Sequence, residues 1–382
     1  MFKSSLTILH ISGIPIKLHI SFLLILPFLA VAIGNNIQQI AVLAGIEPVQ
    51  VEANPYLLGF ILAVLLFVSV AMHELSHSLV ARRRGMKIKD ITLMLLGGVA
   101  QIEDESRRPE DETLMALAGP LLSLALGFLL LFIIRPLTEF LAADYRLIIY
   151  YLGFMNIFLA VFNLLPAFPS DGGRVLRSLL ARKTSYLKAT RIAAAIGKGF
   201  AFMLGVFGLL SAQIILILIA FFIYIGASQE YKFNLIRDTF SEFLVRDLMT
   251  ENVSTVNENI TIRQLLDKML MEKHSGYPVI NDRGELTGCV TLDDIDEIPN
   301  DSEKLKNVGE VMSCELITAS PDEPLFEAFK RLSQADIGRL MVIDETGELV
   351  GILTRSDIMK AYQLKSIRDK QGRGGSDEDL PL

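Results

Sequence analysis

His73, Glu74 and His77 form an HExxH motif that directly follows sixteen uncharged residues, 57–72. On an α-helix, residues i and i+4 share one face, so both imidazoles can bind a single zinc ion. Glu74 then lies close enough to act as general base on a water molecule. The alternative is a set of ionisable side chains without function in an apolar helix, where such groups are costly unless paired or functional. The motif therefore predicts a hydrolytic zinc site at membrane depth.

A third ligand must come from another element, because catalytic zinc has three protein ligands and one open position for water. Asp171 is the best candidate, in the segment NLLPAFPSDGG that follows a later apolar run, residues 163–173. Two prolines end the helix there, and the two glycines after the aspartate are expected to bend the backbone so that the carboxylate turns inward. An Asp-Gly pair is also an ordinary turn dipeptide. Its place opposite the two histidines favours the ligand.

The composition divides the chain into an apolar part and a soluble part. Of the 382 residues, 51% are hydrophobic, and the mean hydropathy is +0.44. Long charge-free runs lie in residues 1–230, which predicts a polytopic membrane protein with a soluble tail. The net charge of −7 and the lack of a basic surface pattern argue against a nucleic-acid partner. Cys289 and Cys314 both lie in the soluble part, as expected in a reducing compartment.

Six membrane spans are predicted from these apolar runs. They cover residues 20–34, 54–82, 114–134 and 147–165, with two more between 189 and 228. The last pair has room for two spans if the first also includes Arg191 and Lys198. Basic residues follow the second and fourth spans, whereas residues 35–56 contain none, so both basic loops are expected in the cytoplasm. An even number of spans then places both termini on the cytoplasmic side of the cell membrane.

The two motifs resemble those of the site-2 protease family, M50-type intramembrane zinc metalloproteases with HExxH on one span and an NxxPxxxxDG-like segment on a later one. The resemblance covers about residues 1–230. It implies a zinc-dependent endopeptidase that cleaves transmembrane protein substrates within the lipid bilayer, in regulated intramembrane proteolysis. It also implies one zinc ion per chain, with these roles: His73, His77 and Asp171 as metal ligands, Glu74 as general base and Asn163 as a substrate-positioning residue. Ser170 departs from the larger apolar residue common before the aspartate, which bears on substrate details and not on the metal.

Residues 87–103 are rich in strand-forming side chains and contain the pair Gly97-Gly98. A helical substrate hides its carbonyl groups in its own hydrogen bonds, so an exposed strand edge could hold it extended for attack. The family is thought to work in this way. The alternative is a re-entrant hairpin that shields the site. Asn156 and Asn163 face the same way on the fourth span, either lining a wet cavity or joining helices.

The soluble part repeats itself: residues 249–294 align with residues 312–357 at a constant offset of 63. Each unit is expected to form helix, strand, glycine turn, strand and helix. The pair resembles tandem CBS domains. That resemblance implies binding of an adenine nucleotide (ATP, ADP or AMP) by Thr291, Asp294, Thr354 and Asp357. Alternatively, the threonines end strands and the aspartates cap helices.

The expected fold is a polytopic α-helical membrane protein of about six transmembrane helices with a small membrane-associated β segment, plus a cytosolic α/β tandem CBS module. The expected domains are a membrane protease domain 1–230, a linker 231–244, CBS repeats 245–298 and 308–365 separated by a linker 299–307, and a disordered tail 366–382. Two other functions remain open: a CBS-regulated transporter, or an inactive relative that acts as a membrane receptor or chaperone. A homodimer through the CBS pair also remains open.

Overall fold

The computed structural model describes residues 5–94, 97–102, 108–296 and 306–372. It divides into two compact units, a membrane unit, Phe2–Asn234, and a repeat unit, Leu235–Leu382. Each is described separately below.

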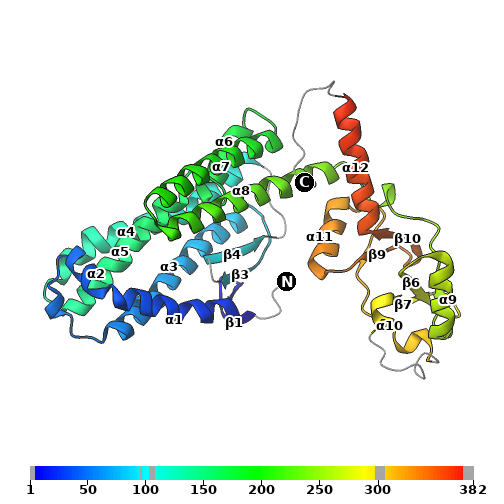
Figure 1. Ribbon diagram of the computed structural model, residues 1–382, viewed down its shortest axis with the longest axis horizontal. Coiled ribbons are helices and arrows are strands. Elements are labelled where there is room, and N and C mark those ends of the chain that lie inside the picture. Colours follow the sequence, from blue (N-terminus) through cyan, green and yellow to red (C-terminus); the bar gives the residue numbers. More distant parts are fainter. Residues whose placement is uncertain (1–4, 95–96, 103–107, 297–305, 373–382) are drawn as a thin grey trace. The chain divides into compact units, whose positions relative to one another are not determined.

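The membrane unit consists of long helices and one small sheet (Figure 1). Its elements are β1 Ser5–Ile11, β2 Ile14–His19, α1 Ile20–Asn35, α2 Ile37–Leu43, a 3-10 turn Pro48–Gln50, α3 Pro55–Arg83, β3 Ile88–Met94, β4 Gly97–Ile102, α4 Pro109–Phe128, a π-helical segment Leu129–Ile134, a 3-10 turn Arg135–Thr138, α5 Ala143–Asn163, α6 Asp171–Ala181, α7 Tyr186–Leu210 and α8 Ile214–Phe240.

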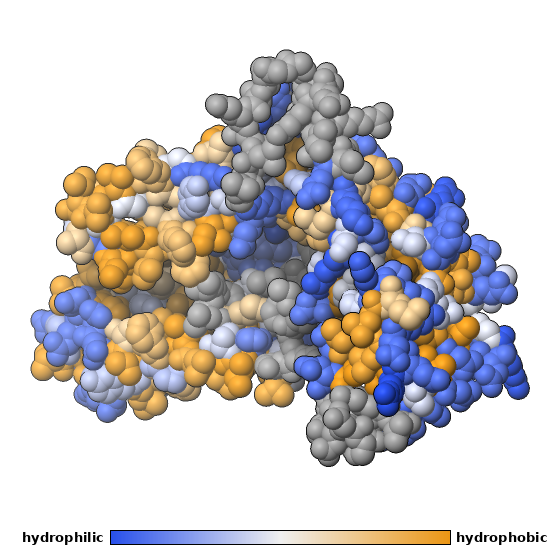
Figure 2. All heavy atoms as spheres, turned by 45° about the vertical axis from the view of Figure 1, so that its right-hand side comes forward, coloured by the Kyte–Doolittle hydropathy of each residue, from blue (hydrophilic) through white to orange (hydrophobic). Residues whose placement is uncertain are grey.

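Five of these helical segments are long and apolar enough to cross a membrane: α3, α4 with its continuation to Thr138, α5, α7 and α8. Helices α1 and α2 form a pair bent by 60°, which makes six if the pair counts as one span. The two spans expected after residue 189 are the separate helices α7 and α8. Hydrophobic residues cover much of the visible surface of the helical bundle, as lipid contact requires (Figure 2). The expected membrane fold is confirmed.

Helix α3 begins and ends where its residues predict. The Asn54 side chain accepts hydrogen bonds from the backbone N–H groups of Tyr56 and Leu57, and Pro55 occupies the first turn. At the other end, Gly85 has φ +84, a conformation that glycine adopts without steric cost. These caps fix the register of the helix, so the HExxH motif lies within about three turns of its end.

The four strands form one sheet in the order β1-β2-β3-β4. Strand β3 pairs antiparallel with β4 and parallel with β2, and a short ion pair of 2.7 Å between Lys17 and Asp90 joins β2 to β3. Within the segment expected to be extended, residues 87–103, residues 88–94 and 97–102 do form strands. Strand β4 lies at one edge of this sheet.

The repeat unit contains two similar halves. Its elements are a 3-10 turn Val245–Asp247, β5 Val256–Asn257, α9 Ile262–Glu272, β6 Gly276–Ile280, β7 Leu286–Thr291, α10 Leu292–Asp296, a second 3-10 turn Val308–Glu310, β8 Thr318–Ala319, α11 Leu325–Ala335, β9 Arg339–Ile343, β10 Leu349–Thr354 and α12 Arg355–Gly372. Residues 63 positions apart also share backbone conformation: Gly284 and Gly347 both lie in turns with positive φ angles, +82 and +86.

Each half also lends its leading segment to the sheet of the other half. Thr250 exchanges backbone hydrogen bonds of 2.9 and 3.0 Å with Ile352, and Ser313 does the same with Cys289. Val245 packs in the core of the second half. The residues of one sequence repeat therefore do not all pack in the same half. Each half completes its sheet with a segment from the other repeat.

Two of the expected connecting segments differ in the structure. Residues 231–240 of the expected linker belong to helix α8, and its last residue, Phe240, packs against Phe329 with ring centroids 5.4 Å apart. Phe240 is almost fully buried, which explains why the helix does not stop earlier. The first seven residues of the expected disordered tail belong to α12. Residues 373–382 and most of the other linker, 299–305, lie outside the described residues.

Candidate metal centre

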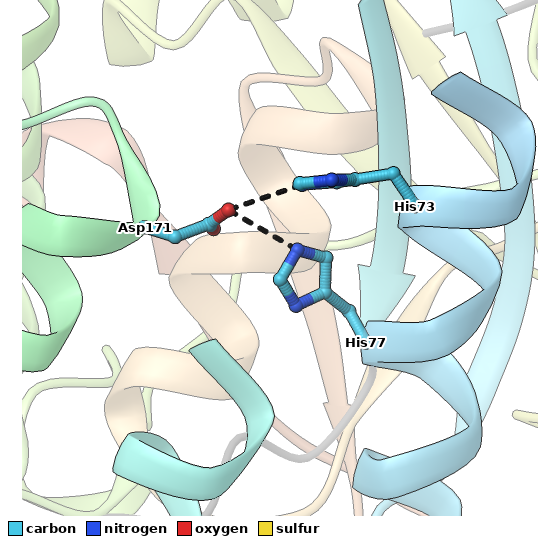
Figure 3. A group of neighbouring side chains, drawn as sticks. All are labelled: His73, His77 and Asp171. Atoms are coloured by element: carbon cyan, nitrogen blue, oxygen red, sulfur yellow. Dashed lines mark hydrogen bonds and ion pairs between the residues drawn. The ribbon is translucent and has the colours of Figure 1, made fainter. Parts of the chain in front are cut away.

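Three side chains from two helices converge inside the membrane unit (Figure 3). His73 and His77 lie one turn apart on α3, and Asp171 is the first residue of α6. The Nε2 atoms of both imidazoles lie 3.2 Å from the same carboxylate oxygen, Oδ2 of Asp171. Both histidines are buried and the aspartate is half-buried. The structure thus brings together the two motifs that the sequence predicts to meet.

The spacing of these three groups fits a zinc ion. Two ligands about 2.1 Å from one ion, at a tetrahedral angle, lie about 3.4 Å apart. The nitrogen–oxygen distances of 3.2 Å match that value. Within the described part of the chain, Nε2 of His77 is buried and makes no hydrogen bond, as expected of an atom reserved for a metal. Two nitrogens and one oxygen are also the donors of many catalytic zinc sites.

Helix α4 contacts the Nδ1 atom of both imidazoles, on the side of each ring opposite Asp171. Nδ1 of His77 lies 2.6 Å from the backbone carbonyl oxygen of Met115. A carbonyl oxygen only accepts, so Nδ1 of His77 carries the proton and Nε2 is left with its lone pair free. Nδ1 of His73 lies 2.9 Å from the hydroxyl oxygen of Ser123. Both rings are therefore anchored on one helix through the nitrogen that does not face Asp171.

Gly119 lies between these two anchors, four residues from each, on the same face of α4. A Cβ atom at this position would overlap Nε2 of His77 and lie 2.5 Å from Nε2 of His73. Glycine is required here because any side chain would occupy the space beside the two Nε2 atoms.

The carboxylate of Glu74 lies beside the edge strand β4. A Cβ atom added at Gly98 would overlap Cγ of Glu74 and lie 3.2 Å from its carboxyl carbon. Close approach of backbone to side chain is a typical reason for glycine in a strand. The edge of the sheet therefore passes directly by the side chain that the HExxH motif marks as general base.

The glycines after Asp171 do not bend the backbone, contrary to expectation. Gly172 and Gly173 lie in the first turn of α6, in regular helix. A Cβ atom at Gly172 would overlap the carbonyl oxygen of Leu165, and one at Gly173 would lie 2.6 Å from the backbone nitrogen of Phe168. The glycines are needed because the preceding loop folds back tightly onto α6, and this packing directs the carboxylate toward α3.

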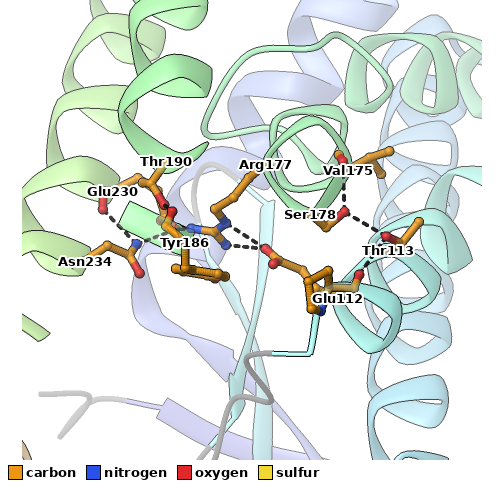
Figure 4. Close-up of polar contacts among 10 residues, drawn as sticks. Glu112, Thr113, Val175, Arg177, Ser178, Tyr186, Thr190, Glu230 and Asn234 are labelled. Carbon is orange, nitrogen blue, oxygen red and sulfur yellow. Dashed lines mark hydrogen bonds and ion pairs between the residues drawn. The ribbon is translucent and has the colours of Figure 1, made fainter. Parts of the chain in front are cut away.

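A buried ionic cluster holds α6 in place (Figure 4). Arg177 donates to the Glu112 carboxylate on α4, with Nε 2.7 Å from Oε1, and also pairs with Glu230 on α8. Its guanidinium lies 5.0 and 4.9 Å from the ring centroids of Phe168 and Tyr186. Arg177 is one of the basic residues after the fourth span that were expected in a cytoplasmic loop, and its side chain is only 4% exposed. It connects the helix that carries Asp171 to two neighbouring helices.

Neither asparagine of the fourth span contacts the three convergent side chains through a described hydrogen bond. Asn163 ends α5 and donates to the carbonyl oxygen of Leu159, 3.0 Å away in its own helix. Asn156 is buried and donates to the Ser69 hydroxyl on α3 at 3.0 Å. Asn156 thus joins two helices, and the role of Asn163 in positioning substrate stays a prediction.

The threonine and aspartate of each repeat form the same local motif. Oδ2 of Asp294 accepts from both the hydroxyl and the backbone N–H of Thr291, each at 2.7 Å. Asp357 makes the equivalent bonds to Thr354 at 2.6 and 3.1 Å. All four residues sit where a strand meets a helix, so they cap helices, and their partly exposed side chains leave room for contact with a ligand.

Comparison with known proteins places the chain in a family. The profile of peptidase family M50 matches residues 61–142 and 138–206, and the CBS domain profile matches residues 245–300 and 308–364. A zinc metalloprotease of Methanocaldococcus jannaschii is 38% identical over 366 residues, which cover 96% of this chain and 98% of the relative. The chain belongs to peptidase family M50.

Two solved structures are each similar to part of this M50 protease. The site-2 protease from Methanocaldococcus jannaschii shares 44% identity and covers 59% of this chain and 95% of its own, with a TM-score of 0.44. CBSX2 in complex with AMP shares 29% identity and covers 32% and 98%, with a TM-score of 0.30. The sequence-based identification of a membrane zinc metalloprotease with a tandem CBS pair is confirmed by the family profiles and the relative.

The contribution of α4 to the site of this M50 protease was not predicted from the sequence. Ser123 is the only hydroxyl residue between positions 114 and 137, and Gly119 precedes it by one helical turn. A lone polar residue in an apolar span is a signal of a buried partner. The same reasoning applies to Glu112 and Arg177, two charges near span ends, but the partner of each became evident only in the structure.

Proposed function

We propose that this M50 protease is a zinc-dependent intramembrane endopeptidase that cleaves transmembrane protein substrates. One observation carries the proposal: His73, His77 and Asp171 converge with ligand spacing inside a bundle of membrane-spanning helices. These three residues would hold the metal, and Glu74 is the proposed general base. A transporter would have no use for this donor set beside a carboxylate base.

In the proposed mechanism, bound zinc supplies a Lewis acid that polarises the peptide carbonyl and lowers the pKa of water. Nε2 of each histidine and Oδ2 of Asp171 keep the site in one geometry. Glu74 accepts a proton from the attacking water and later delivers it to the leaving amine nitrogen. Met115 and Ser123 keep the imidazole rings from rotating, and Asn163 is proposed to orient the substrate.

The proposed function is tested by coexpression with candidate single-span membrane proteins, followed by mass measurement of the fragments. We expect two fragments that meet within the span, no cleavage after treatment with a zinc chelator, and recovery when zinc is returned. Absence of zinc in the purified protein would favour a transporter. Bound zinc without cleavage of any candidate would favour an inactive receptor or chaperone.

We further propose that the substrate binds as an additional strand on β4. In the described residues β4 pairs on one side, with β3, and its backbone at Gly98 touches Glu74. A substrate strand added to that edge would lie extended beside the general base, with its carbonyl groups freed from helical hydrogen bonds.

The variant Val99→Pro tests strand addition. Proline removes a backbone N–H from β4 and restricts its φ angle, so we expect cleavage to fall by about tenfold or more while zinc content stays unchanged. Val99→Thr keeps the N–H and a branched side chain and should retain activity. The quantities to measure are the cleavage rate and zinc per chain. An equal loss of both in the proline variant would indicate misfolding, whereas unchanged cleavage in that variant would contradict strand addition.

The repeat unit is proposed to bind an adenine nucleotide and thereby regulate cleavage. Its membership of the CBS family supports this proposal, together with the partly exposed Thr291, Asp294, Thr354 and Asp357 at equivalent positions. A nucleotide changes activity only through different affinities for two conformations of the protein.

Calorimetric titration of the full chain with ATP and AMP tests nucleotide binding. We expect heat of binding in the wild type and a reduced affinity in Asp294→Ala and Asp357→Ala. Loss of a helix cap costs about 0.5–2 kcal/mol of stability, so thermal unfolding must be measured alongside. Asp322→Ala is a suitable control, because that side chain is 70% exposed and lies outside the motif. No heat at millimolar nucleotide would refute the proposal.

The repeat unit and both chain ends are proposed to lie on the cytoplasmic side. The basic residues after α3 support this orientation through the positive-inside rule, provided that α1 and α2 form one span.

The two native cysteines make a direct test of orientation possible. Cys314 is exposed, whereas Cys289 is buried, and burial raises the pKa of its thiol to about 11. A membrane-impermeant maleimide should therefore label Cys314 alone, in inverted vesicles and not in right-side-out vesicles. Cys314→Ser should abolish the label. Labelling in right-side-out vesicles only would reverse the orientation.

A further inference from the structure

We infer that Ser123 is a positioning residue whose hydroxyl oxygen accepts the Nδ1 proton of His73 when Nε2 of that ring binds the metal. The inference rests on the proposed zinc site and concerns the part of it supplied by α4. Ser123 lies on α4, a third helix, and neither the HExxH motif on α3 nor Asp171 on α6 supplies a group that orients His73 in this way.

The two imidazoles are anchored by different kinds of acceptor. Nδ1 of His77 faces the Met115 carbonyl oxygen, which belongs to the backbone and accepts whatever the side chain at that position. Nδ1 of His73 faces the Ser123 hydroxyl at 2.9 Å. A hydroxyl can donate or accept, so it binds either tautomer of His73. When Nε2 of His73 binds a metal, Nδ1 carries the proton and the Ser123 oxygen is the acceptor.

The surroundings give Ser123 no evident packing role. Its side chain is 1% exposed, in a helix whose other residues between positions 114 and 134 are apolar or glycine or proline. Placing a hydroxyl in such surroundings is costly unless it has a partner, and the partner found is the histidine ring. Without this oxygen, an N–H at Nδ1 would be buried without an acceptor, which favours the tautomer that cannot bind zinc through Nε2.

Metal-bound histidines commonly donate their second N–H to an outer partner, and loss of that partner typically weakens metal binding about 10–100-fold. Ser123 would thus affect the affinity for zinc without contacting the ion. This effect should depend on the hydroxyl oxygen of Ser123 and not on the volume of the side chain.

Two variants with side chains of equal shape distinguish the effect of the hydroxyl oxygen from the effect of side-chain volume. Ser123→Thr keeps the hydroxyl and Ser123→Val replaces it with a methyl group. We expect zinc affinity, measured in competition with a chromophoric chelator, to be about 10–100-fold lower in the valine variant than in the threonine variant. The visible absorption of the cobalt-substituted protein should change in the valine variant and resemble the wild type in the threonine variant.

Ser69→Ala is the matched control for loss of a buried hydroxyl near the site. Ser69 lies one turn before His73 on α3 and accepts a hydrogen bond from Asn156, and within the described part of the chain it makes no hydrogen bond to either imidazole. Its zinc affinity should stay close to that of the wild type. The inference is overturned if the threonine and valine variants bind zinc within threefold of each other, or if Ser69→Ala loses as much affinity as Ser123→Val.

The same measurements separate this inference from the proposed function. Zinc binding that depends on the Ser123 oxygen, in a wild type that cleaves no substrate, would support the inference and contradict the proteolytic function. If the wild type cleaves substrate but the threonine and valine variants bind zinc equally well, the proteolytic function is supported and the inference is contradicted.

Discussion

Replacement of Glu74 by glutamine is expected to lower the rate of substrate cleavage by about a hundredfold to ten-thousandfold while one zinc ion per chain remains bound. The amide has the shape of the carboxylate, so it can occupy the same space beside Gly98. An amide oxygen does not accept a proton at neutral pH, so the attacking water keeps its proton. The cleavage rate of the purified protein and its zinc content measure the two effects separately.

Glu139→Gln provides a control for the change from carboxylate to amide. Glu139 is exposed and lies in the connection between α4 and α5, away from the three convergent residues. Activity should be unchanged in this variant. Full activity in Glu74→Gln would show that another group moves the proton, and loss of zinc in that variant would show that Glu74 has a structural role instead.

Alanine at position 119 is expected to prevent zinc binding, with a fall in affinity of about a hundredfold or more, beyond the typical loss for an outer partner of a metal ligand. The added methyl carbon would overlap Nε2 of His77 and lie 2.5 Å from Nε2 of His73. Because helix α4 carries both anchors of these rings, it cannot move away without breaking the contacts of Met115 and Ser123. Zinc per chain and cleavage rate should fall together.

Gly199→Ala is the matched substitution in another span. A Cβ atom at Gly199 would have no neighbour within 4 Å, so alanine should leave zinc binding unchanged and raise helix stability by up to about 1 kcal/mol. If Gly119→Ala bound zinc as tightly as Gly199→Ala, the space beside the two ligand nitrogens would not be limiting, and the account of α4 would fail.

Local periodicity was enough to predict both the metal-binding pair and the repeat. His73 and His77 lie on one face of α3 because four residues make about one helical turn, whatever surrounds the helix. The offset of 63 residues predicted two equivalent halves, and their turns at Gly284 and Gly347 match in backbone conformation. Asp171 was predicted less directly, from the side of the membrane on which its segment ends.

Tertiary packing decided the roles of residues that have no local pattern. Gly172 and Gly173 were expected to bend the chain, but they make room for the loop that folds back onto α6. Arg177 was expected in a loop, but it is buried between Glu112 and Glu230. The function of Arg177 depends on atoms that are distant in the sequence, and that of the two glycines depends on how the loop just before them folds.

The sequence by itself determined which groups are available for chemistry: two imidazoles and a carboxylate in one apolar span, an aspartate after a later span, and then a repeated soluble module. Only the tertiary structure decided which helix orients the imidazoles, that the edge strand β4 touches Glu74 and that the two repeats exchange their leading segments. The physical reason is that helix and strand patterns arise from neighbours along the chain. An apolar span, by contrast, has no polar face to show which helix it will pack against.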